Sequence, residues 1–153
     1  MSTTRIEAED LLLNGYFIEN GSFASNGQYI GLFDLALFQQ GDLPPGSTGS
    51  ASYNFDGTAG TYTLSLGYYD EQDGVGQLAL QVGDTTIEQW SLDENTTGKN
   101  ASGNTFRLRT IEGVQLAFGD MITLLGTASD PAGEWARIDY LELALTEPAP
   151  TED

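Results

Sequence analysis

The feature that most constrains the fold of this chain is an alternation of apolar and polar residues over positions 60–70, which read GTYTLSLGYYD. Successive side chains of a β-strand point to opposite faces of a sheet, so a period of two produces one apolar and one polar face. The stretch therefore predicts a strand with one face in the core. Its alternating apolar residues are Tyr62, Leu64, Leu66 and Tyr68.

The same alternation recurs along most of the chain. Gly-Asp, Asp-Gly and Asn-Gly pairs separate the alternating segments, and these residues tolerate the positive φ angles of tight turns. Many short strands joined by turns predict an all-β fold, an antiparallel β-sandwich of the jelly-roll type. A closed barrel fits the pattern nearly as well and stays open. Further strands are predicted at residues 50–55, 76–84, 85–92, 105–108, 113–118, 121–127 and 136–145.

Three segments depart from this pattern. Residues 32–40, LFDLALFQQ, suit either a helical or a strand period, and we expect an irregular loop or a strand there rather than a helix. Residues 42–49, DLPPGSTG, predict a loop. The proline- and acid-rich end, residues 146–153, predicts an extended linker or tail. The chain is thus predicted to be one sandwich domain over residues 5–145, cut from a larger protein.

Composition excludes several classes of function. The 23 acidic and 5 basic residues give a formal net charge of −18, which repels nucleic acids and anionic lipids, so neither is expected as a partner. The absence of histidine and cysteine excludes disulfides, the usual zinc, iron–sulfur and haem sites, and Ser-His or Cys-His catalysis. No apolar run approaches the length of a membrane span. An enzyme mechanism would have to use carboxylates or the single Lys99.

A cluster of carboxylates opens the chain. In residues 5–10, RIEAED, Ile6 and Ala8 can point inward as in a strand. This arrangement places Glu7 and Glu9 together on the opposite face. Like charges this close repel one another, so the pair needs a cation or free access to water.

A matching acid lies near the other end of the sequence. In residues 136–143, ARIDYLEL, Asp139 is predicted to share the face of Leu141 and Leu143. If the first and last strands pair, this acid and the two opening glutamates converge at a sheet edge and can supply oxygen ligands to Ca²⁺. The alternative is two solvated edges whose charges discourage pairing with further strands.

These motifs together resemble a known family. The opening IEAED, the core pattern G-x-Y-x-L that begins at Gly60, and the closing RIDYLEL resemble the carbohydrate-binding modules of families six, thirty-five and thirty-six. The similarity covers residues 6–145. It implies a β-sandwich that binds sugars without catalysing a reaction, and a structural calcium ion held by Glu7, Glu9 and Asp139.

The segment before the closing strand offers a second group of polar and aromatic side chains. Residues 127–135, TASDPAGEW, carry Asp130, Glu134 and Trp135 on a loop shaped by proline and glycine. In family thirty-six a calcium ion at this place coordinates sugar hydroxyls. The resemblance implies Asp130 and Glu134 as its ligands here, with Trp135 stacking on a sugar ring or lending a backbone carbonyl. The alternative is a turn in which Trp135 covers the end of the core.

Two further aromatic residues are candidate sugar contacts. Trp90 is out of period with Ile87 in TIEQWSL, so either a bulge intervenes or the indole faces outward, where it would form a stacking surface. Tyr29, in NGQYIGLF, lies in the segment where members of the resembled family carry a binding aromatic.

The acidic segment YYDEQDGVG is not predicted to bind a metal. It contains Asp70, Glu71 and Asp73, but no glutamate closes an EF-hand loop at the twelfth position. The simpler interpretation is a hairpin turn at Asp73-Gly74 with its charges in water.

The sequence favours a secreted, monomeric, non-catalytic module that targets a parent multi-domain enzyme to a plant or algal polysaccharide. Structural calcium, with calcium-assisted sugar binding, belongs to this hypothesis. A structural or adhesive calcium-binding domain of a large secreted surface protein is the main alternative. A small glycosidase or lyase using two carboxylates, or a tyrosine with Lys99, is the third.

Overall fold

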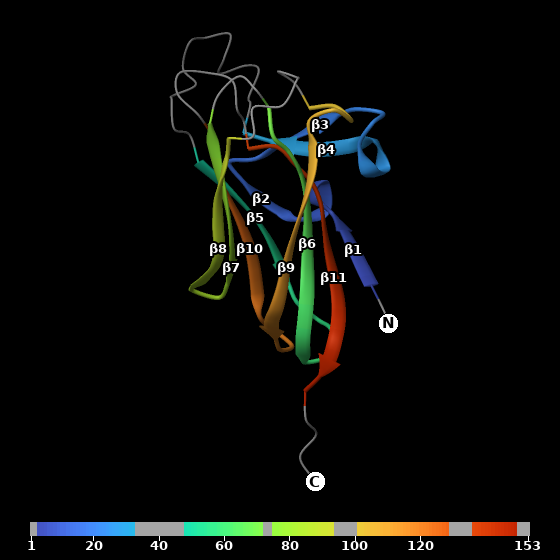
Figure 1. Ribbon diagram of the computed structural model, residues 1–153, viewed down its shortest axis with the longest axis vertical. Helices are drawn as coiled ribbons and strands as arrows, with labels where there is room; N and C mark the ends of the chain where they lie inside the picture. The colour runs from blue at the N-terminus through green and yellow to red at the C-terminus, as the bar shows by residue number, and fades with distance from the viewer. Residues whose placement is uncertain (1–2, 33–47, 72–74, 94–100, 129–135, 150–153) are drawn as a thin grey trace.

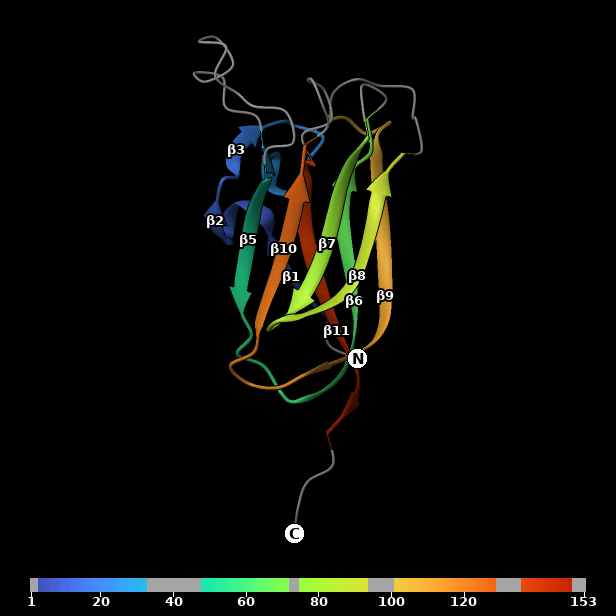
Figure 2. The same cartoon turned by 90° about the vertical axis from the view of Figure 1, so that its left-hand side faces the viewer.

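The chain folds as two antiparallel sheets packed face to face (Figures 1 and 2), and the computed structural model describes residues 3–32, 48–71, 75–93, 101–128 and 136–149. Within these residues there is no α-helix, only two short 3₁₀ turns, η1 (Ala8–Asp10) and η2 (Ser25–Gly27). No helix in this part of the chain is long and apolar enough to cross a membrane. The β-sandwich prediction is confirmed, and the barrel alternative is wrong because the strands divide between two separate sheets.

The larger sheet has six strands in the order β3-β4-β11-β6-β9, with β1 also paired to β11. The smaller sheet has five strands in the order β2-β5-β10-β7-β8. The larger sheet comprises β1 (Thr3–Glu7), β3 (Phe17–Asn20), β4 (Gln28–Gly31), β6 (Gly60–Tyr69), β9 (Phe106–Leu116) and β11 (Ile138–Pro148). The smaller sheet comprises β2 (Leu12–Asn14), β5 (Thr48–Asn54), β7 (Gly76–Val82), β8 (Thr85–Leu92) and β10 (Met121–Thr127).

The first and last strands pair, which meets the condition for the two acidic motifs to converge. Strand β1 runs antiparallel to β11, with Glu7 opposite Tyr140 and Thr3 opposite Ala144. Figure 1 shows β1 lying along β11 at one side of the sandwich. Because these strands come from opposite ends of the sequence, their pairing brings the two predicted acidic motifs to the same place.

The alternation in β6 produces two apolar clusters, one on each face of the larger sheet. Leu64, Leu66 and Tyr68 are buried in the main core between the sheets. Tyr69, the next residue, points the other way and belongs to a smaller cluster. That second cluster consists of Ala24, Tyr29, Tyr69 and Ala101, with Phe106 packed against it.

Several predicted boundaries shift. The two short strands predicted at 105–108 and 113–118 are one strand, β9, in which an extra residue forms a bulge opposite β6 and Gly113 adopts a φ of +74°. Strand β5 begins at Thr48, inside the predicted loop. Strand β11 continues to Pro148, so it takes in the first residues of the predicted linker. Residues 33–40 of the ambiguous segment lie outside the described residues.

Strand β6 lies between β11 and β9 and carries buried core side chains, so shortening them should cause a large loss of stability. Leu64 is fully buried, so Leu64→Ala should lower the free energy of unfolding by about 2–5 kcal/mol through lost apolar burial and a residual cavity. Urea unfolding followed by tryptophan fluorescence measures the change. Leu12 is 73% exposed, and Leu12→Ala is the matched control, expected to change the stability by no more than about 0.5 kcal/mol. Equal effects of the two substitutions would contradict the core assignment.

Candidate functional site

The paired terminal strands bring the predicted calcium ligands to one turn of the chain. The η2 turn holds one oxygen of each carboxylate. The backbone N–H of Ser25 donates to Asp139 Oδ2 at 3.0 Å, and its hydroxyl donates to Glu7 Oε2 at 2.8 Å. The side-chain amide of Asn26 donates to Glu9 Oε2 at 3.3 Å. Acids from both ends of the sequence therefore meet at residues 25 and 26.

The second oxygen of each carboxylate is left without a partner. Glu7 Oε1, Glu9 Oε1 and Asp139 Oδ1 are buried and accept no hydrogen bond from the described residues. A buried, unpaired anionic oxygen is costly, and three in one place suit a hard cation that prefers oxygen ligands. In the part of the chain with described coordinates, no three acidic side chains form a ready-made metal-binding group. A cation would have to draw these carboxylates inward, and backbone carbonyls or water would complete its shell.

Burial sets the electrostatics of these acids. Asp139 is 2% exposed, and this burial raises its pKa although Ser25 and the Tyr69 hydroxyl donate hydrogen bonds to it. Burial also raises the pKa of Glu9. The charge of Arg5 attracts Glu7 and Asp139 and opposes the rise in the pKa of Asp139, but its guanidinium is also paired with Glu142 at 2.8 Å and donates to the Ser25 hydroxyl at 3.1 Å. One arginine, shared with Glu142, therefore serves three carboxylates, and the group carries an excess of negative charge.

Two details of the predicted geometry are wrong. Strand β1 ends at Glu7, so Glu9 lies in the η1 turn rather than two positions along the same strand. In β11 the register shifts between Ile138 and Tyr140, which lets both Ile138 and Leu141 reach the main core. Asp139 consequently does not share the face of Leu141 and contacts Tyr69 of the second apolar cluster instead. The three acids do come together, but the η1 turn places Glu9 and the bulge in β11 places Asp139.

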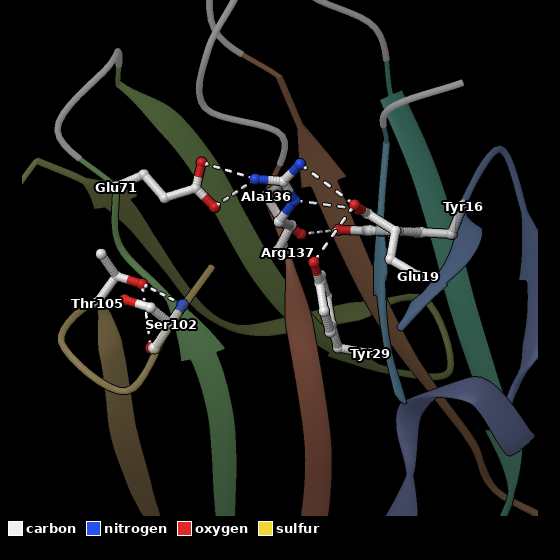
Figure 3. Close-up of polar contacts among 8 residues, drawn as sticks. All are labelled: Tyr16, Glu19, Tyr29, Glu71, Ser102, Thr105, Ala136 and Arg137. Carbon is white, nitrogen blue, oxygen red and sulfur yellow. Dashed lines mark hydrogen bonds and ion pairs between the residues drawn. The ribbon is translucent and has the colours of Figure 1, made fainter. Parts of the chain in front are cut away.

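A buried ion cluster lies where β3, β6 and β11 come together (Figure 3). Arg137 donates from Nε and Nη2 to the two oxygens of Glu19, at 3.0 and 3.2 Å. From Nη1 it donates to both oxygens of Glu71, at 3.0 and 2.9 Å. Burial alone would lower the pKa of Arg137, but the charges of Glu71 and Glu19 outweigh burial and raise it. We call Glu19, Glu71 and Arg137 the Arg137 cluster.

The Arg137 cluster corrects a prediction. The charges of Asp70 and Glu71 were expected in water, whereas these residues are 1% and 0% exposed. Asp73 lies outside the described residues. No local pattern marks Glu71 as buried, because its partner Arg137 comes from a different strand far along the sequence.

The predicted sugar-contacting aromatics have different outcomes. Tyr29 is 7% exposed, and its hydroxyl points to Glu19. Trp90 is 8% exposed beneath the guanidinium of Arg109, which lies 4.5 Å from its ring. Little of either ring is open to a ligand, and their roles as sugar contacts stay predictions. The other candidates, Asp130, Glu134 and Trp135, lie outside the described residues.

Sequence reasoning missed a neutral polar surface on the smaller sheet. Two shallow cavities of about 320 and 140 Å³ lie along β5, β10, β7 and β8, and none of the described residues that line them is charged. In a chain of net charge −18, such a face is a candidate surface for a neutral, hydroxyl-rich ligand. The sequence did offer a signal for this surface: in GQLALQV, residues 76–82, the side-chain amides of Gln77 and Gln81 fall on the side of the strand opposite Leu78 and Leu80. Hydrogen-bonding side chains on this face include Asn14, Ser50, Gln77, Gln81, Gln89 and Thr127.

The chain is similar in sequence to parts of larger enzymes. It is 28% identical over 145 residues to an alpha-glucuronidase of Hypocrea jecorina and 30% identical over 146 residues to a probable alpha-glucuronidase A of Aspergillus oryzae. Each alignment covers 91% of this chain but only 16% of the relative. The chain therefore spans about a sixth of the length of these curated relatives. No protein-family model matches the sequence.

The solved structures with a similar fold include isolated carbohydrate-binding modules. A family 35 module from Clostridium thermocellum aligns with a TM-score of 0.66 and 15% identity, over 95% of this chain and 100% of the module. The C-terminal CBM6 of a marine laminarinase from Zobellia galactanivorans aligns at 0.60 and 22%, over 94% and 99%. A CBM36 domain of a multidomain xylanase from the hindgut metagenome of Trinervitermes trinervoides aligns at 0.58 and 18%, over 98% and 100%. The chain has the β-sandwich fold of these modules.

The burial of the Arg137 cluster predicts an asymmetry between its ion pairs and those at the surface. Glu71→Gln weakens two buried hydrogen bonds from Arg137, which keeps Glu19 as its counter-charge, and should lower the free energy of unfolding by about 1.5–3 kcal/mol. Glu88→Gln, which breaks the half-exposed pair with Arg109, should cost less than about 1 kcal/mol. Urea unfolding compares the two. If the two substitutions cost the same, the Arg137 cluster is not buried as described.

Proposed function

We propose that this chain is a non-catalytic carbohydrate-binding module that targets a secreted parent enzyme to a plant or algal polysaccharide. One observation carries the proposal: the chain aligns with the whole of an isolated family 35 module but with only 16% of each alpha-glucuronidase relative. A chain that aligns with all of a binding module and with a small share of an enzyme fits a targeting unit attached to that enzyme. The module alone would bind the polysaccharide weakly, and its binding would add to the binding of the parent enzyme to the same polymer.

The chemistry of the chain supports a sugar ligand. Sugars are neutral and rich in hydroxyl groups, so a binder needs an aromatic face for the ring and fixed polar groups or a metal for the hydroxyls. In this proposal Trp135 supplies the aromatic face and Asp130 with Glu134 supplies oxygen ligands. Tyr29 and Trp90 contribute less, because both are buried. The amide-rich face of the smaller sheet offers a further neutral surface to a long polymer.

We also propose a structural calcium ion at Glu7, Glu9 and Asp139. The three buried oxygens without partners support it, as does the need for positive charge at that place. When bound, the ion would supply the charge that holds β1, η1 and β11 together. The carboxylates would bind it through the oxygens that the η2 turn leaves free.

Binding to polysaccharides tests the proposed function. In native gels containing glucuronoxylan, alginate or laminarin with calcium present, the wild-type chain should be retarded by at least one polymer. Trp135→Ala should abolish most of the retardation, because one aromatic ring contributes a large part of a weak site. Phe118→Ala is the control, since Phe118 is 77% exposed and precedes β10 whereas Trp135 follows it.

Two results would contradict this function. If none of the three polymers retards the chain, the structural or adhesive alternative is favoured. Release of reducing ends from any of them would favour the glycosidase or lyase.

Thermal unfolding tests the calcium ion. At calcium concentrations near a hundred times the Kd, binding adds about 2.7 kcal/mol, so EDTA should lower the Tm by about 5–10 °C and calcium should restore it. Glu7→Gln should abolish the response. Asp84→Asn, an exposed acid in the β7–β8 turn, should leave it intact. A Tm that ignores both EDTA and calcium would show that no such ion stabilises the fold.

A further inference from the structure

A cavity of about 350 Å³ lies on the outer face of the larger sheet, on the side away from the main core. Its walls come from β1, the segment around η2, residue 103, β9 and β11. This size falls in the range of small-ligand sites. Among the described residues, it shares no lining residue with the two shallow cavities of the smaller sheet, and it adjoins the second apolar cluster through Ala24 and Phe106. It is therefore a separate candidate place for a ligand.

Three aromatic rings border this cavity, and we call Phe23, Phe106 and Tyr140 the aromatic wall. Phe106 and Tyr140 are stacked, with ring centres 5.9 Å apart and planes at 29°. Gly67 of β6 makes room for them, because a Cβ atom there would lie 2.8 Å from Tyr140 and 3.0 Å from Phe106. The ring of Phe23 packs edge-on against Tyr69, yet Phe23 remains 40% exposed. The outer face of the sheet thus presents flat apolar rings next to an open space.

Arg5 supplies hydrogen-bond donors beside the aromatic wall. Its guanidinium lies 3.9 Å from the centre of the Tyr140 ring. Nε donates to Glu142 at 2.8 Å, Nη2 lies 2.8 Å from the same carboxylate, and Nη1 donates to the Ser25 hydroxyl at 3.1 Å. A guanidinium has five N–H groups, so Nη1 and Nη2 each keep one that bonds to none of the described residues. The Arg5 side chain is 43% exposed, which leaves these two N–H groups open to a ligand.

The charges around the cavity favour a neutral ligand. Among the described residues that line it, Arg5 is the one base and Asp139 the one acid. The Asp139 carboxylate is already engaged, since Oδ2 accepts hydrogen bonds from Ser25 and Tyr69 and Oδ1 is assigned to the proposed calcium ion. A charged ligand of either sign would meet a like charge at the wall. Apolar rings beside free N–H donors suit a molecule with a C–H face and hydroxyl edges, which describes a pyranose sugar.

We propose that the cavity bordered by Arg5 and the aromatic wall binds one ring of a neutral pyranose sugar. The C–H face of the sugar packs on the rings, and its hydroxyl oxygens accept hydrogen bonds from the two free N–H groups of Arg5. This inference rests on the proposed function for the class of ligand. It goes further than that function because it assigns a second sugar site, built from described strands of the larger sheet and independent of Trp135.

Short neutral sugars test the site directly. The ¹⁵N-labelled chain is titrated in the presence of calcium with xylobiose, cellobiose, laminaribiose and mannobiose, and two-dimensional ¹⁵N–¹H spectra follow the binding. At least one sugar should shift the backbone signals of Ala24, Ser25 and Phe106 and the Nε–H signal of Arg5. A single weak site should give shifts that grow smoothly with the sugar concentration.

Gly103 allows the cavity to be filled without disturbing its walls. A Cβ atom at Gly103 would meet no atom within 4 Å, and the φ angle of this residue lies outside the left-handed region. Gly103→Leu should therefore abolish the shifts by placing a side chain in the cavity, with an unchanged Tm. Asn104→Leu is the matched control, since Asn104 is the exposed next residue and does not line the cavity. The control should keep the wild-type shifts.

Two phenylalanines of equal exposure test the aromatic wall. Phe23→Leu keeps the apolar bulk but removes the flat ring, and should weaken sugar binding about twofold to tenfold. Phe17 is also 40% exposed and lies on β3, outside the cavity. Phe17→Leu should leave the affinity unchanged. This pair decides the matter if Gly103→Leu does not fold.

The outcomes separate this site from the proposed function. Shifts at the cavity that Gly103→Leu abolishes support the site, and if no polymer retards the same chain in gels, only the targeting function is overturned. If no sugar shifts the cavity signals, the site is overturned whether or not a polymer retards the chain. Shifts confined to Gln77 and Gln81 of the smaller sheet also overturn it. So does an equal loss of binding in Gly103→Leu and Asn104→Leu, or equal affinities of the two phenylalanine variants.

Discussion

The pairing of β1 with β11 is the contact on which the account of this chain depends. It joins the two ends of the sequence in one register, with Glu7 opposite Tyr140. That register brings Asp139 to the η2 turn, where Ser25 bonds to Glu7 as well. Three carboxylates then share one place, each with one bonded and one free oxygen. Without this pairing the acids would be separate surface charges.

The topology places two groups of buried charged side chains in different parts of the larger sheet. The carboxylates at the paired strands suit a cation that supports the fold, while the Arg137 cluster lies at the end of the larger sheet where the segment before β11 is attached. Each place uses buried charge, but in opposite ways. The carboxylate group has more negative charge than the nearby Arg5 offsets, whereas the Arg137 cluster contains its own cation in direct contact with both acids. This difference is why we assign structural metal binding to the first place and not to the second.

The fold could be predicted from the sequence because its information is local. The period of two in β6 and the turn residues around it need no knowledge of distant contacts, and the predicted limits of β8 and β10 match the structure. The sequence made the meeting of Glu7, Glu9 and Asp139 conditional on the pairing of the terminal strands, and the strands do pair. Their detailed placement did not, because the η1 turn and the bulge in β11 depend on what packs against them.

The buried charges were beyond such reasoning. Glu71 looks like a turn residue until Arg137 and Glu19 are placed beside it, and only the tertiary structure does this. Trp90 likewise looked like a possible sugar platform until Arg109 was found over its ring. The amide-rich face of the smaller sheet could have been found, since Gln77 and Gln81 alternate with the buried residues of β7.

Anomalous X-ray diffraction from crystals grown with calcium tests the central claim most directly. The account predicts one strong anomalous peak within coordination distance of Glu7, Glu9 and Asp139, in contact with the oxygens that the η2 turn leaves free. Density at that place explained by water alone, with the three carboxylates directed into solvent, would contradict it.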